Sequence, residues 1–88
     1  MPSFSWSPAC KLFLVLVEEA QSDQWGTMSN GTNAIATPIR YGVVPAGASE
    51  LTPPTSLTPG TPYIVSVYRW VGPGQQDGTL IGQQAFTP

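Results

Sequence analysis

The residues able to do chemistry in this chain are few, and their spacing brings none of them into a reactive group. The 88-residue sequence contains no histidine and one cysteine, which excludes Ser-His and Cys-His nucleophilic pairs and the commonest metal ligand. Glu18 and Glu19 are adjacent, so in a strand their carboxylates point to opposite faces and cannot act together on one substrate. We therefore expect no enzyme, no catalytic residue, no metal site and no cofactor.

Two further motifs have simpler structural interpretations. Cys10 cannot form an internal disulfide, and we interpret it as a small buried residue at a strand end. Lipidation and pairing with a cysteine elsewhere in a longer parent are the alternatives. Gly72 and Gly74 flank Pro73 with no helix after them, which indicates a turn and not a phosphate-binding loop.

The composition indicates one small β domain spanning residues 1–88. Charged residues make up 9% of the chain, against about 25% in ordinary domains, and 9 Gly and 10 Pro indicate many turns. Three dispersed cations and a net charge of −2 exclude nucleic-acid binding through a basic surface and attraction to anionic membranes.

The start of the chain has no basic region and no long apolar segment, so we expect no signal peptide. The longest apolar run, Leu12 to Val17, is far shorter than the about 20 residues that span a bilayer. The low charge and the abundance of Thr, Ser, Gly and Pro fit a domain taken from a longer exported protein, with Met1 supplied for expression.

Alternating apolar residues between turn signals predict six or seven short strands. A helix over residues 11–20 is the competing interpretation, but the run is short and is bounded by Pro8 and by Gln21-Ser22-Asp23, which favours a strand. Pro38 limits any strand in 34–44 to an edge or to the residues after it. The expected strands are 3–7, 11–18, 24–28, the part of 34–44 after Pro38, 49–52, 63–70 and 79–86, with a hairpin loop at 71–78.

The strongest local signal is the run from Leu57 to Tyr63, in which Pro59 and Gly60 form a turn and Tyr63 opens a strand. Such a tyrosine at a sandwich corner hydrogen-bonds nearby backbone through its hydroxyl. With the segments Phe4-Ser5-Trp6-Ser7-Pro8 and Ala85-Phe86-Thr87-Pro88, the run resembles fibronectin type III domains of the bacterial secreted and lipoprotein-associated kind.

The resemblance implies an all-β, antiparallel, Ig-like sandwich in which Trp6 packs beneath Leu57 and Tyr63, with Val65 and Val67 also in the core. Only five residues precede Trp6, which leaves little room for the family's first strand. Either the chain begins at the second strand, or the first position is empty or filled by another chain. The family supplies no catalytic residue, and its cell-adhesion tripeptide is absent here.

The strands at 11–18 and 63–70 are neighbours in that family, which gives their sheet an apolar outer face. If Phe13, Val15 and Val17 face the core, alternation sends a second set outward. An exposed apolar face of this size indicates a partner, a neighbouring domain or self-association, unless loops cover it. The candidate interaction face is Leu12, Leu14, Leu16, Ile64, Tyr68 and Trp70.

The expected function is therefore a non-catalytic structural or protein-interaction module of an exported bacterial protein, located outside the cell or on its surface. One alternative is a self-assembling subunit of an extracellular filament or surface layer, because an unpaired sheet edge recruits strands. The other is a carbohydrate-contacting module in which Trp25, Tyr41, Tyr68 and Trp70 stack on sugar rings.

Overall fold

The computed structural model describes residues 2–6, 10–20, 22–31, 33–70 and 79–88. The hairpin loop expected at 71–78 lies outside these residues. Within them there is no helix, and the strands are β1 (Ser3–Phe4), β2 (Leu14–Glu19), β3 (Ser22–Ser29), β4 (Ile39–Arg40), β5 (Ala48–Thr52), β6 (Tyr63–Arg69) and β7 (Thr79–Phe86).

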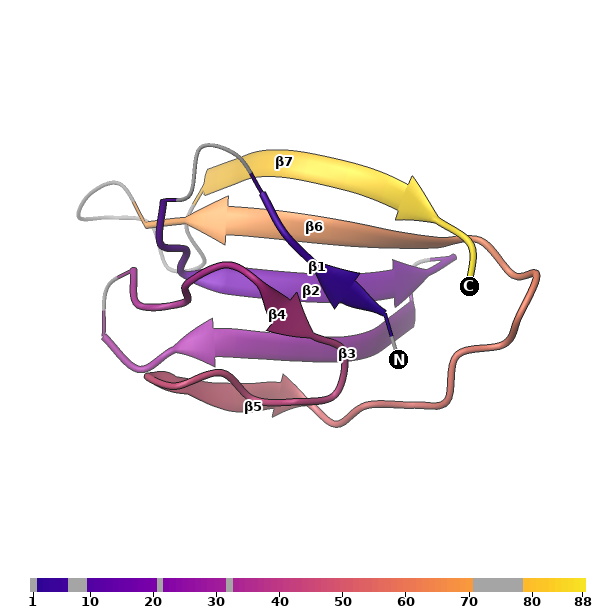
Figure 1. Cartoon of the computed structure of the whole chain (residues 1–88), viewed down its shortest axis with the longest axis horizontal. Coiled ribbons are helices and arrows are strands. Elements are labelled where there is room, and N and C mark those ends of the chain that lie inside the picture. The colour runs from indigo at the N-terminus through magenta and orange to yellow at the C-terminus, as the bar shows by residue number, and fades with distance from the viewer. Residues whose placement is uncertain (1, 7–9, 21, 32, 71–78) are drawn as a thin grey trace.

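The strands form two antiparallel layers, so the expected all-β antiparallel sandwich is confirmed. One sheet has five strands in the order β5-β3-β2-β6-β7, and the other contains only β1 and β4. Figure 1 shows the smaller sheet in front of the middle of the larger one. Because the layers differ so much in size, β1 and β4 cannot cover the whole inner face of the larger sheet.

The apolar run near the N-terminus forms a strand, as the turn signals around it predicted. β2 lies at the centre of the larger sheet, where it pairs antiparallel with β3 on one side and with β6 on the other. A central strand that is buried on both faces has a continuous run of apolar residues in its sequence. This burial explains why its sequence lacks clear alternation.

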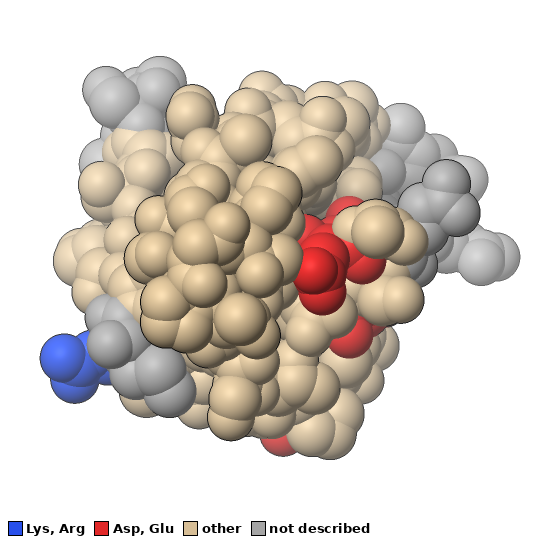
Figure 2. All heavy atoms as spheres, turned by 90° about the vertical axis from the view of Figure 1, so that its right-hand side faces the viewer, with Lys and Arg blue, Asp and Glu red and all other residues tan. Residues whose placement is uncertain are grey.

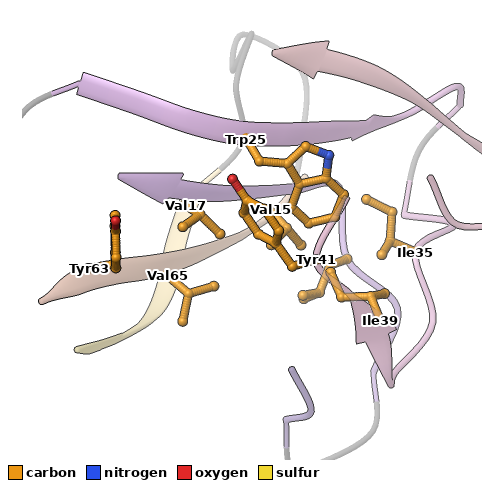
Figure 3. Close-up of a cluster of buried hydrophobic side chains, with 9 residues drawn as sticks. Val15, Val17, Trp25, Ile35, Ile39, Tyr41, Tyr63 and Val65 are labelled. Atoms are coloured by element: carbon orange, nitrogen blue, oxygen red, sulfur yellow. The ribbon is translucent and has the colours of Figure 1, made fainter. Parts of the chain in front are cut away.

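The hydrophobic core lies between the two sheets and is centred on two aromatic residues (Figure 3). Trp25 and Tyr41 are 0% and 1% exposed, and their ring centroids are 5.3 Å apart. The Tyr41 hydroxyl donates to the backbone oxygens of Gln24 and Thr55, at 3.1 and 2.6 Å. Trp6, Leu57 and Val67, which we expected in the core, are partly buried and pack against this cluster, whereas Tyr63 and Val65 belong to it.

The expectation that Leu12 lies on the outer face is wrong. Leu12 is fully buried in the core together with Val15 and Val17. Its backbone pairs with Ile35 in an isolated bridge, and a bend at Phe13 separates it from β2. Side chains alternate between faces only along an unbroken strand, so the bend turns Leu12 to the same side as Val15.

The corner predicted before β6 has the expected hydrogen bond. The backbone N–H of Thr58 donates to the Tyr63 hydroxyl at 2.7 Å, and Gly60 has a φ of 84°, which glycine adopts without strain. The Tyr63 ring also stacks on Phe86 with a centroid distance of 5.8 Å. The tyrosine therefore ties the turn, β6 and the end of β7 together.

We expect Tyr63→Phe to lower the free energy of unfolding by about 1 kcal/mol, because the Thr58 N–H loses its partner while the ring packing is kept. Urea denaturation followed by circular dichroism measures the change. An unchanged midpoint for Tyr63→Phe would show that the corner bond contributes nothing.

Candidate interaction site at the open side of the sandwich

Three acidic residues, Glu18, Glu19 and Asp23, lie beside the turn that joins β2 to β3, whereas Glu50 lies on β5; Figure 2 shows a group of acidic side chains at this end of the molecule. In the β2–β3 hairpin, Glu18 is opposite Asp23 and Glu19 is opposite Ser22, so Glu18 and Glu19 lie on different faces, as adjacent strand residues do. The pairing of Glu18 with Asp23 was not predicted, because it depends on a register shift next to Glu18. In the described part of the chain, no group of three or more acids or cysteines is placed to hold a metal ion.

The outer face of the larger sheet is less continuous than the sequence predicted. Leu14 is only 3% exposed, whereas Ile64 is 43% exposed, and Leu16, Tyr68 and Trp70 are partly buried. Between these positions the Gln83 amide reaches over to the Ser66 hydroxyl at 3.0 Å. This polar bridge, with Glu18 beside Ile64 in the register, divides the apolar face into smaller parts.

Two exposed leucines extend this face, and the sequence analysis missed both. Leu80 on β7 is opposite Tyr68, and Leu51 on β5 lies beside Gly26, over which Leu16 also leans. Leu51 and Leu80 are 49% and 47% exposed. The local sequence contained no clear signal for either, since Leu80 is followed by Ile81 and Leu51 is a single apolar residue between Glu50 and Thr52. Their face became clear only once the strand order was known.

The aromatic residues named for sugar stacking are not all accessible. Trp25 and Tyr41 are buried in the core and cannot offer a ring face to a ligand, so their assignment to a sugar site is wrong. The polar pattern around Trp25 concealed its burial, because Thr27 and Ser29 on the same strand are buried too. Tyr68 and Trp70 alone remain of the expected platform.

A groove of about 490 Å³ lies between β1 and the inner face of β6 and β7. Val65 and Val67 form its floor, and its wall is formed by Phe4 on β1 and by Trp6, two residues after β1 ends. At one end, the Phe4 and Phe86 rings meet edge to face with centroids 5.2 Å apart. None of its lining residues is charged; they are Pro2, Ser3, Phe4, Ser5, Trp6, Val65, Val67, Gly82, Gln83, Gln84 and Phe86.

The groove follows from the unequal sheets. β1 pairs only with β4, and β7 is an outer strand of the larger sheet, so two strand edges without a strand partner in the described chain border the opening. No third strand of the small sheet lies over Val65 and Val67 in the described chain, although Val65 is only 8% exposed and Val67 is partly buried.

Hydrogen bonds show which backbone groups on either side of β1 already have a partner. The Tyr41 N–H donates to the Pro2 oxygen at 2.9 Å, and the Trp6 N–H donates to the Thr37 hydroxyl at 3.3 Å. Backbone groups alternate in direction along an extended chain. Those of Ser3 and Ser5, both exposed, therefore point away from β4 toward the open edge.

Comparison of the chain with protein-family models, with curated proteins and with solved structures gives no match. The class that the coordinates define is an all-β antiparallel sandwich of two unequal sheets. No helix in the described ranges has the length and apolar character needed to cross a membrane.

Proposed function

We propose that the chain is a non-catalytic protein-interaction module that binds an extended segment of a partner protein along β1. The observation that carries the proposal is the apolar groove beside an unpaired strand edge. In this kind of recognition, backbone hydrogen bonds supply affinity while alternate side chains enter pockets. The Ser3 and Ser5 backbone groups would supply the bonds, and Val65, Val67 and Trp6 would receive the side chains.

The chemistry of the groove favours a neutral segment with apolar residues at every second position. Its lining contains three large apolar or aromatic residues on β6 and β7 and no charge, so a charged side chain entering it would lose hydration without gaining a partner. Trp6, which is partly exposed just after β1, is the type of residue that dominates binding energy at protein interfaces.

We also propose the family to which the chain belongs and the cellular location of its parent protein. The Tyr63 corner bond and the antiparallel sandwich support membership of the fibronectin type III family, and the low charge supports an exported bacterial parent. Recovery of the parent protein from the medium or cell-surface fraction tests its location, and finding it only in the cytosol would refute that part of the proposal.

We expect Ser5→Pro to abolish strand binding without unfolding the domain, because it removes an outward N–H at a strand edge. The probe is a capped, uncharged peptide in which valine alternates with threonine. Binding is measured by NMR as slowed amide exchange at Ser3 and Ser5, by about tenfold or more in the original chain.

Ser5→Ala is the matched control, since it removes the same hydroxyl and keeps the N–H. It should bind the peptide as the original chain does. Peptide binding that leaves the Ser3 and Ser5 amides unaffected, or that survives Ser5→Pro, would contradict strand addition at β1. Absence of binding by peptides with valine, leucine and phenylalanine at the alternating positions would also refute it.

A further inference from the structure

The two outer strands of the larger sheet differ in how well their edges are protected. β5 has five residues, carries Glu50, and is followed at once by Pro53 and Pro54. Charge, short length and proline all oppose pairing with another chain. β7 has eight residues, Thr79 to Phe86, with no charge and no proline. The edge of β7 is therefore less protected against pairing with another strand than the edge of β5.

A β-bulge defines which part of β7 can pair regularly. Leu80 is opposite Tyr68 and Gly82 is opposite Val67, so Ile81 is an extra residue on β7. Bulges disturb the edge on which they occur. The segment beyond the bulge, residues 82–86, pairs with β6 without interruption, and its middle residue is Gln84.

From these features we propose that two copies of this chain pair through β7, antiparallel and centred on Gln84. The pairing joins the two larger sheets into one continuous sheet. The pairing uses the hydrogen-bonding edge of β7 and not that of β1, although Gly82, Gln84 and Phe86 of β7 also line the groove.

The side chains fit this register. With Gln84 opposite Gln84 of the second copy, Phe86 of each chain lies opposite Gly82 of the other, on the face that carries the groove. A Cβ atom on Gly82 would lie 3.2 Å from Val67 Cγ2. The space beside Gly82 is therefore bordered by the apolar side chain of Val67. An aromatic residue across from an edge glycine is a stabilising pair.

The second copy is the occupant that the charges favour. Both meeting strands are uncharged, so homotypic pairing brings no like charges together, whereas pairing of two β5 edges would oppose two Glu50 carboxylates. The regular part of β7 is short, so we expect a weak dimer with Kd between about 10 μM and 1 mM.

Sedimentation velocity over a concentration series tests the pairing. We expect the original chain to dimerise and Gln84→Lys to weaken the dimer at least about tenfold, because it places two lysines opposite each other at the centre. Gln84 is exposed, so the fold should tolerate the change. Ser49→Lys, an equal substitution on exposed β5, should leave the dimer unchanged.

A cross-link tests the register. In a Cys10→Ser background, Gln84→Cys should form a disulfide-linked dimer under mild oxidation, because directly opposite Cα atoms lie about 4.5 to 5.5 Å apart. Ser49→Cys in the same background should not. A monomer at all concentrations up to about 1 mM, a dimer that Gln84→Lys leaves intact, equal weakening by Ser49→Lys, or no cross-link at position 84 would each overturn the proposal.

Discussion

Trp25→Ala is expected to lower the free energy of unfolding by about 3 to 5 kcal/mol. Trp25 is 0% exposed, and its removal leaves a cavity next to the Tyr41 ring, which lies 5.3 Å away between centroids. A domain of this size has roughly 4 to 13 kcal/mol of stability in total. The loss therefore equals the whole stability at the lower end of this range and more than a fifth of it at the upper end.

We expect the substitution to lower stability by more than the cavity alone would, because Tyr41 joins two segments of the chain through its hydroxyl. Its hydroxyl holds the Gln24 and Thr55 backbone oxygens, which fastens the chain leaving β5 to β3. A Tyr41 ring that moves into the space left by Trp25 would weaken both bonds. We expect urea denaturation, followed by circular dichroism, to show a lower midpoint for Trp25→Ala.

Two variants keep this prediction testable if Trp25→Ala does not fold. Trp25→Phe retains a ring, and the Trp25 Nε1 has no hydrogen-bond partner in the described part of the chain, so this change removes volume without breaking a bond and should cost less. Trp6→Ala deletes the same atoms from a partly exposed site and should also cost less. A cost within about 1 kcal/mol of zero for Trp25→Ala would contradict its place at the core centre.

The sequence predicted the strands well where turn residues bound them. Pro59 and Gly60 predicted the turn before β6, and Pro38 limited any strand in 34–44 to an edge or to the residues after it, where β4 lies. Local chemistry is sufficient for such boundaries, because proline fixes its φ angle and glycine adopts positive φ without strain, whatever surrounds them. The choice of strand over helix for β2 was correct for the same reason.

The core and the site were harder to predict because they depend on which strands meet. Trp25 lies among polar residues, and nothing local shows that β3 is covered by Tyr41 from the other sheet. The sequence predicted an unpaired sheet edge but not the groove beside it. Its floor residues, Val65 and Val67, were expected in the core, where Val65 lies and against which Val67 packs; the groove over them depends on the unequal width of the two sheets, which the sequence did not show.

Leu12→Ala should lower the free energy of unfolding by about 2 to 5 kcal/mol, the cost of removing a buried leucine from a packed core. Leu12 is fully buried beside Val15 and Val17, although simple alternation from Val15 and Val17 assigns it to the outer face. The prediction therefore tests the bend at Phe13 directly, since without the bend the side chain would lie with Leu14 and Leu16.

Leu16→Ala is the matched control, because it removes the same atoms from a partly buried residue on the outer face. Its cost should be clearly smaller, since Leu51 and solvent share the space around it and the cavity can collapse or fill. Both costs come from the same urea denaturation. Equal costs, or a larger cost for Leu16→Ala, would mean that Leu12 does not face the core, and that the alternation of β2 continues unbroken to residue 12.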